Sequence, residues 1–209
     1  RRMLDEERIL IVDLAGIGEG NARLFGSFLV SAIGQAALSR ADTPPQLHRP
    51  AFLFVDEYPQ VAGGGFKRIL AMARNVSLSL VLAQQYLSQV APDLRNAVLG
   101  AAGNVVALRA GADDAKILAE HLALPSHLDY SGTGAREITG AERLVALEKY
   151  RAFARIPDDP SLDGSIELEL LPPPAPVTMA VWTPLIVGRG VLRSGRKGTS
   201  LGMHWNALV

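Results

Sequence analysis

Cysteine is absent from the 209 residues, which excludes disulfide frameworks, thiolate metal sites and a cysteine nucleophile. Histidine is scarce: the four histidines are scattered without the spacing of metal ligands, so no zinc site is expected. Neither sign of charge is in excess, because 21 basic residues balance 21 acidic ones and the formal net charge is zero. A protein that coats DNA through a broad basic surface is therefore not expected, although a local basic patch remains an option.

A membrane-spanning helix is also missing from the sequence. The longest stretch without charge, residues 170–188, contains five prolines and cannot form such a helix. A hydrophobic fraction of 48% excludes an extended disordered chain. The chain opens on Arg1-Arg2-Met3 with no signal peptide after it, and we expect it to be a piece cut from a longer protein.

Short apolar runs alternate with helical segments over the first 122 residues. The runs RILIVDL (8–14), AFLFV (51–55), LSLVLA (78–83) and NVVAL (104–108) are each typical of a strand buried on both faces of a parallel sheet. Helices are predicted over about residues 21–40, 65–75, 93–100 and 113–122. This order predicts an α/β fold, with a mostly parallel sheet and helices on both of its faces.

The pattern changes beyond Pro125. A short helix is predicted over residues 142–147, and the runs 150–156 and 165–171 are expected to form a small β-hairpin. A proline-rich stretch follows, and residues 177–209 contain four basic residues and no acidic one. We therefore predict three units: residues 1–124, an appendage over residues 125–174, and a basic tail over residues 175–209.

Polar residues stand at the ends of three predicted strands: Asp56-Glu57, Gln84-Gln85 and Arg109. Open α/β sheets bind ligands beyond the carboxyl ends of their strands. Two carboxylates at such an edge suit nucleotide hydrolysis, since one can hold Mg²⁺ through its water shell while the other activates a water molecule. The alternative is structural: the acids form a solvated turn, and the glutamines satisfy backbone groups at the strand end.

Three segments carry a family resemblance: FLFVDEYPQVA, ILAMARNVSLSLVLAQQYLSQV and AVLGAAGNVVALRAGADDAKILAEHL. They resemble the conjugative coupling-protein (TraD/TraG-like) branch of the HerA–FtsK superfamily of P-loop motor ATPases. The resemblance covers about residues 8–122 and, more weakly, the chain as far as residue 174. It implies a RecA-like sheet in which VDE is the Walker B motif. Asp56 would then hold Mg²⁺ through water, and Glu57 would be the catalytic glutamate.

The same resemblance assigns further roles. Gln85 matches the polar sensor of the family, and Gln84 takes a position that is commonly histidine. Arg74 matches the arginine expected to reach the nucleotide of the neighbouring subunit; its alternative is a solvated helix arginine beside Lys67. Arg109 is a weaker candidate of the same kind. Asp114 is expected, independently of the resemblance, to belong to the start of a predicted helix, where an acid suits the helix dipole.

The phosphate-binding signature G-x-x-x-x-G-K-[ST] does not occur in these residues. In the family, this loop follows a strand that precedes everything present here. The chain therefore resembles the Walker B half of a motor, and by itself it is not expected to hydrolyse ATP. The family's sheet order places the phosphate-loop strand between the runs 78–83 and 104–108. We accordingly expect a vacancy or a substitute strand there, with residues 204–209 as the candidate.

The resemblance implies part of a hexameric, ATP- and Mg²⁺-dependent DNA translocase of conjugative (type IV) secretion. DNA, bound weakly by this chain alone, and relaxosome or secretion-channel proteins are its expected partners. Its expected location is cytoplasmic, at the inner face of the bacterial cell membrane. The alternative is a non-catalytic recognition module for accessory DNA-processing proteins. A generic Rossmann-like binding domain is a third option, which lacks the G-x-G-x-x-G fingerprint.

Overall fold

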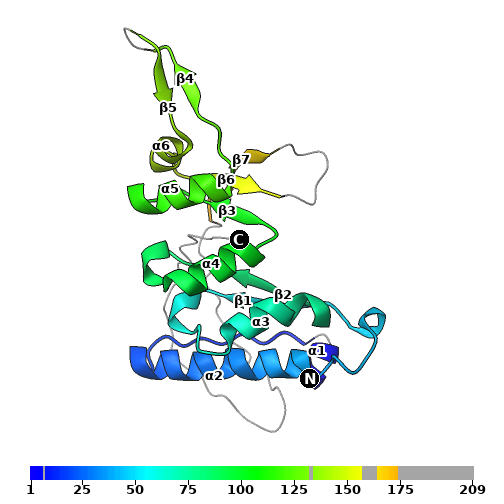
Figure 1. The fold of residues 1–209 in the computed structure, drawn as a ribbon. Coiled ribbons are helices and arrows are strands. Elements are labelled where there is room, and N and C mark those ends of the chain that lie inside the picture. The colour runs from blue at the N-terminus through cyan, green and yellow to red at the C-terminus, as the bar shows by residue number, and fades with distance from the viewer. Residues whose placement is uncertain (7, 132–133, 157–163, 174–209) are drawn as a thin grey trace.

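A computed structural model describes residues 1–6, 8–131, 134–156 and 164–173, which form a mixed α/β fold (Figure 1). The helices are α1 (Arg2–Asp5), α2 (Glu19–Leu38), α3 (Phe66–Met72), α4 (Pro92–Ala101), α5 (Ala112–His121) and α6 (Gly140–Val145). The 3₁₀ turns are η1 (Pro45–Leu47), η2 (Tyr58–Gln60), η3 (Ala73–Val76) and η4 (Leu87–Gln89). The strands are β1 (Ala51–Val55), β2 (Leu78–Leu82), β3 (Val105–Ala107), β4 (His127–Asp129), β5 (Arg136–Ile138), β6 (Arg151–Arg155) and β7 (Ser165–Glu169). Within these ranges, no helix combines the length and apolarity needed to cross a bilayer.

The first core lies between the β1–β2 pair and the helices α2 and α3. The two strands run parallel, with Ala51 opposite Leu78 and Val55 opposite Leu82. Side chains alternate between the faces of a strand, so Leu53 and Val55 turn to this core while Phe52 and Phe54 remain exposed. The α2–α3 side of the sheet is therefore packed, and the opposite side of β1 carries exposed aromatic rings.

The second core lies under an antiparallel sheet with the strand order β3-β6-β7. Leu118 and Leu122 of the α5 region pack there with Leu144 of α6 and Phe153 of β6. The predicted hairpin of β6 and β7 is observed, with Arg151 opposite Glu169. Helices α5 and α6, which fall in the two neighbouring predicted units 1–124 and 125–174, thus share one core. A second hairpin, β4–β5, was not predicted and projects from this end of the molecule (Figure 1).

Two of the predicted parallel strands are corrected by the structure. Residues 8–14 form no strand, and Ile9 and Ile11 are largely exposed. The fourth run forms β3, but its partner is β6, and the two are antiparallel. A strand exists only with a hydrogen-bonding neighbour. Residues 8–14 form no ladder with any described strand, whereas β3 pairs with the later hairpin. Among the described residues the sheets are therefore small, one parallel and two antiparallel, and the predicted mostly parallel sheet is not seen.

The expected vacancy or substitute strand between β2 and β3 stays a prediction. Among the described strands, β2 pairs with β1 alone and β3 with β6 alone, so β2 and β3 are not neighbours. The candidate substitute strand, residues 204–209, lies outside the described residues, as does the whole predicted basic tail.

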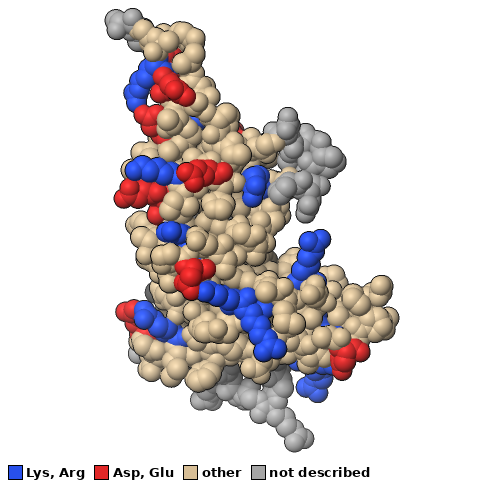
Figure 2. Space-filling view, viewed as in Figure 1, with Lys and Arg blue, Asp and Glu red and all other residues tan. Residues whose placement is uncertain are grey.

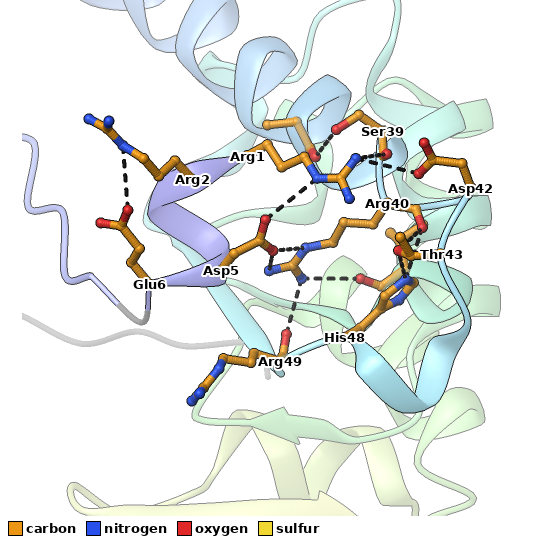
Figure 3. A network of polar contacts seen from close by, with 12 residues as sticks. Arg1, Arg2, Asp5, Glu6, Ser39, Arg40, Asp42, Thr43, His48 and Arg49 are labelled. Atoms are coloured by element: carbon orange, nitrogen blue, oxygen red, sulfur yellow. Dashed lines mark hydrogen bonds and ion pairs between the residues drawn. The ribbon is translucent and has the colours of Figure 1, made fainter.

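A buried arginine fixes the end of the sheet at which β1 and β2 begin (Figure 3). Arg40, just after α2, is 1% exposed and pairs with Asp5 at 2.9 Å. Its Nη1 donates to the carbonyl of Arg49 at 3.0 Å and to that of Val76 at 3.4 Å. A buried guanidinium is tolerated because it is paired and hydrogen-bonded. This network ties α1 and the end of α2 to the residues that precede both strands.

Candidate functional site

The carboxyl ends of β1 and β2 form one edge of the sheet, here called the carboxylate edge: Asp56, Glu57, Gln84 and Gln85. The backbone ladder continues past both strands. The amide of Ala83 donates to the carbonyl of Val55 at 3.0 Å, and the amide of Tyr58 donates to the carbonyl of Ala83 at 3.1 Å. Because these bonds join the two strand ends, the Asp56-Glu57 pair lies directly beside the Gln84-Gln85 pair.

The two acids occupy a tight turn. Asp56 is exposed, and its Oδ1 accepts a hydrogen bond from the amide of Glu57 at 3.0 Å. Glu57 is half-buried and has a φ of 49°, in the left-handed region. A non-glycine residue in this region costs of order 1–3 kcal/mol, and such residues concentrate at functional sites. The turn thus holds Glu57 in a conformation that the surrounding structure must stabilise.

The two glutamines differ in their surroundings. Gln85, which matches the polar sensor of the resembled family, is exposed. Gln84 is 4% exposed, and its Oε1 is buried without a hydrogen-bond partner. A buried acceptor without a partner is costly, and such atoms in native proteins call for an explanation such as a functional role. The structure therefore adds Gln84 to the candidates. Alternation along the strand places Gln84 on the same face as Leu78 and Leu82, which are buried. This alternation was the sequence signal that could have indicated that Gln84 is buried.

Tyr58, next to Glu57, was not singled out from the sequence. It is 1% exposed, its ring stacks on Phe66 with centroids 5.9 Å apart, and its hydroxyl has no hydrogen-bond partner. Burial disfavours the phenolate and raises the pKa of Tyr58 to about 12. The aromatic stack fixes the segment that follows the two acids to α3.

Tyr58 predicts an alkaline loss of stability. The folded pKa of about 12 lies above the usual value of 10, so the folded state retains the proton longer. The protonated Tyr58 therefore contributes about 3 kcal/mol to the free energy of unfolding below pH 10, and this contribution is lost as the pH rises from 10 to 12. Urea unfolding of Tyr58→Phe should show a shallower decline above pH 10. At pH 7 the substitution should cost under about 1 kcal/mol, because it removes an unpartnered hydroxyl. Parallel declines in the two proteins would contradict this assignment.

Arg74 lies far from the carboxylate edge. It is exposed in η3, just before β2, and therefore at the end of the sheet where the strands begin. The five-residue strands place it roughly 16 Å or more from the acids of its own chain. Among the described residues no acid pairs with Arg74, whereas Lys67 on α3 pairs with Asp93 on α4. That hydrogen bond holds the pKa of the Asp93 carboxyl below its usual range.

The other two charged candidates have simpler positions. Arg109 is exposed just after β3. Asp114 lies in the first turn of α5, and its Oδ2 accepts a hydrogen bond from the amide of Leu87 at 2.9 Å. This bond fixes η4 to α5, which gives Asp114 a structural role at the helix start.

Asp56 and Glu57 suit a metal ion that is held mainly by water and phosphate, and not one enclosed by protein side chains. Among the described residues, no group of three or more histidine, aspartate or glutamate side chains could enclose a cation. Mg²⁺ bound with a nucleotide keeps several waters and needs only one or two protein carboxylates. The exposed carboxylate of Asp56 suits such a water-mediated contact, and the phosphates would have to be held by other residues.

Comparison with known proteins supports the fold. Neither a protein-family model nor a curated protein matches this chain. Among solved structures, the chain is similar to the plasmid coupling protein TrwB in complex with the non-hydrolysable GTP analogue GDPNP, with a TM-score of 0.52 and 18% sequence identity. The match covers 73% of this chain and 38% of that chain. The chain therefore has a fold similar to part of a coupling protein, and it spans well under half of that protein's length.

Proposed function

We propose that this chain is the Walker B part of an ATP-driven coupling ATPase that moves DNA in conjugative secretion. The observation that carries the proposal is the carboxylate edge. Asp56 and Glu57 follow a parallel strand whose end pairs with the end of β2. The end of β2 carries Gln84, whose buried amide oxygen has no hydrogen-bond partner among the described residues. This arrangement occurs in a fold similar to that of a coupling protein solved with a nucleotide analogue.

Each residue of the edge has a distinct role in this proposal. Asp56 would hold the water shell of Mg²⁺, and Glu57 would orient and polarise the attacking water. Gln84 or Gln85 would contact that water or the terminal phosphate without neutralising the phosphate charge. Bound Mg²⁺ would supply neutralisation of the charge that develops on the phosphates. The phosphate-cradling amides and lysine would come from a phosphate-loop segment that these 209 residues do not contain.

Assembly and DNA contact form the second part of the proposal. We place the active protein in a homo-oligomeric ring, a hexamer by the family resemblance, at the inner face of the bacterial cell membrane with relaxosome or secretion-channel proteins. Net charge is zero, and acidic and basic side chains are interspersed on the face shown in Figure 2. DNA contact should therefore depend on assembly, and this chain alone should bind DNA weakly with a shallow salt dependence.

A recognition module is the second candidate function. The sequence upstream of these residues discriminates the two candidates, because a phosphate loop there supports the motor and a segment without one supports the module.

The deciding experiment compares this chain alone with the joined ATPase, defined as this chain fused to an N-terminal coupling-protein segment that carries a phosphate loop. The chain alone should hydrolyse no ATP. The joined ATPase should hydrolyse ATP in a Mg²⁺-dependent manner, and DNA should stimulate the rate. A folded joined ATPase that binds nucleotide yet remains inactive under all these conditions would reject the motor in favour of the module.

A further inference from the structure

A cavity of about 210 Å³ lies beside the buried arginine at the start of the sheet. It is smaller than the roughly 300–1,000 Å³ of sites for drug-sized ligands, and it therefore suits a small ion. Three arginines and one carboxylate line it, and Asp42, outside the lining, pairs with Arg1 at 3.4 Å, so positive charge remains in excess. The polar lining residues are Arg1, Asp5, Arg40, Thr43, His48 and Arg49 (Figure 3).

Arg40 has hydrogen-bond donors to spare at this cavity. A guanidinium carries five N–H groups. Nε donates to Oδ1 of Asp5 at 3.0 Å, and Nη1 donates to the carbonyls of Arg49 and Val76. Nη2 lies 2.9 Å from the same oxygen of Asp5, but it makes no hydrogen bond with any described residue. Its two N–H groups are therefore buried donors that an additional anion could satisfy.

His48 contributes a second unused atom. Its Nε2 lies 2.8 Å from Oγ1 of Thr43 and 2.9 Å from the carbonyl oxygen of Arg40. A carbonyl only accepts, and the Thr43 hydroxyl already donates its own hydrogen to that carbonyl at 2.7 Å, so Nε2 must carry the proton of the neutral ring. The other nitrogen, Nδ1, is buried without a partner among the described residues. It becomes a donor only when the ring takes up a second proton.

We propose that this cavity binds a small tetrahedral oxyanion of the phosphate class, either free phosphate or a terminal phosphomonoester. Nη2 of Arg40 donates to the anion, and His48 takes up a proton at Nδ1 and donates it as well. The exposed Arg1 and Arg49 add positive charge at the rim. Donors on several side chains suit a tetrahedral anion, which accepts in several directions, better than a planar carboxylate. Asp5 competes for Nη2, and the bound anion takes over this contact.

Anion binding and proton uptake are linked at His48. An anion near Nδ1 favours the charged ring, so binding should strengthen as the pH falls through the range in which histidines titrate. Arginine and aspartate side chains do not change charge between pH 6 and pH 8, and neither does sulfate. A pH dependence measured with sulfate therefore reports the histidine. The other charged groups around the cavity are Arg1, Arg40, Arg49, Asp5 and Asp42.

An NMR titration of the 209-residue chain with sodium sulfate tests the proposal, because the ring of His48 reports both binding and protonation. Its Cε1–H resonance is identified as the one lost in His48→Gln. With chloride holding the ionic strength constant, sulfate should shift this resonance saturably. The midpoint of its pH titration should rise by about one unit, which corresponds to a tenfold preference of the anion for the charged ring.

Two further ligands distinguish the sources of the anion. Inorganic phosphate should shift the same His48 resonance. A short oligonucleotide with a terminal phosphate is compared with the same oligonucleotide ending in a hydroxyl. A shift with the phosphorylated strand alone assigns the cavity to the end of a nucleic acid as well, and a shift with neither strand restricts it to the free anion.

Matched variants separate a built site from a general effect of charge. Arg49→Gln removes a charge from the rim and should weaken sulfate binding by roughly threefold. Arg2→Gln removes the same charge from α1 outside the cavity, where the side chain is 86% exposed, and should leave the affinity unchanged. Asp5→Asn removes the competing carboxylate and should strengthen binding by about tenfold, even if it lowers the stability of the fold.

Three results would overturn the anion site: a shift of the His48 resonance that stays linear in sulfate, equal affinities in Arg2→Gln and Arg49→Gln, or weaker binding in Asp5→Asn. Each would mean that sulfate acts on surface charge in general and that the cavity is part of a purely structural network. No nucleotide and no phosphate loop take part in these measurements, so either outcome leaves the ATPase proposal standing.

Discussion

Replacing Glu57 with glutamine should leave nucleotide binding to the joined ATPase within about twofold and should lower the rate of hydrolysis by about 10²–10⁴. The amide keeps the size and the hydrogen-bonding reach of the carboxylate, but it cannot polarise a water molecule as an anion does. The turn should tolerate the change, because Glu57 is half-buried and no ion pair of the described residues uses its side chain. Single-turnover hydrolysis and equilibrium binding of a nucleotide analogue separate the two effects.

Three further variants are needed to interpret this result. Asp56→Asn should weaken Mg²⁺-dependent nucleotide binding itself, because it removes the charge proposed to hold the metal's water shell. Gln85→Ala and Gln84→Ala test whether the exposed or the buried glutamine contributes to hydrolysis. If Glu57→Gln kept full activity while Asp56→Asn lost it, the assignment of the activating carboxylate to Glu57 would be wrong.

Local patterns in the sequence predicted several individual elements well. The run 51–55 forms β1 with the predicted bounds, and β2, α3, α4 and α5 begin and end within a few residues of the predictions. These elements have strong signals: continuous apolar runs for the strands, and a proline or early acids at the helix starts. Because β1 and β2 are parallel neighbours, the prediction that Asp56 and Glu57 lie beside the two glutamines also follows.

Strand partners were not predictable in the same way. Residues 8–14 and 104–108 have the apolar composition of buried parallel strands, yet the first forms no ladder with a described strand and the second pairs antiparallel with β6. Composition reports how much apolar surface a segment must bury, and it contains no information on which neighbour supplies the hydrogen bonds. The expectation of a vacancy between β2 and β3 came only from the family resemblance, and the structure places these two strands in separate sheets.

The faces of α2 were also ambiguous from sequence. Leu24 and Phe28 have the period of a core-facing stripe, but the structure buries Gly26, Val30 and Gly34. Small residues allow α2 to pack closely on α3 and on Val61. The helix therefore buries its face of small residues, and its larger apolar side chains remain exposed. A hydrophobic period identifies a helix, but when two faces are apolar it does not show which one is internal.

Arg74 should contribute to hydrolysis only across a contact between copies. In the joined ATPase, Arg74→Ala should spare nucleotide binding by a monomer and lower the hydrolysis rate of the assembled ring by roughly 10³ or more, as expected for an arginine supplied in trans. The geometry requires the neighbour, because Arg74 lies at the end where β2 begins and the acids lie where β1 ends. Arg68→Ala is the matched control: it removes the same charge from an exposed position on α3 and should leave the rate within about twofold.

Mixed rings provide the decisive measurement for Arg74. Rings of Arg74→Ala subunits or of Glu57→Gln subunits lack one of the two groups at every interface, so both should be nearly inactive. When the two kinds of subunit are mixed, some interfaces place the intact Glu57 of one subunit against the intact Arg74 of its neighbour. Activity should therefore return in proportion to the fraction of such interfaces, which varies with the mixing ratio and is greatest near equal amounts. If rings shown to be mixed recovered no activity at any ratio, Arg74 would not belong to the site, and its position on η3 would be that of a solvated arginine.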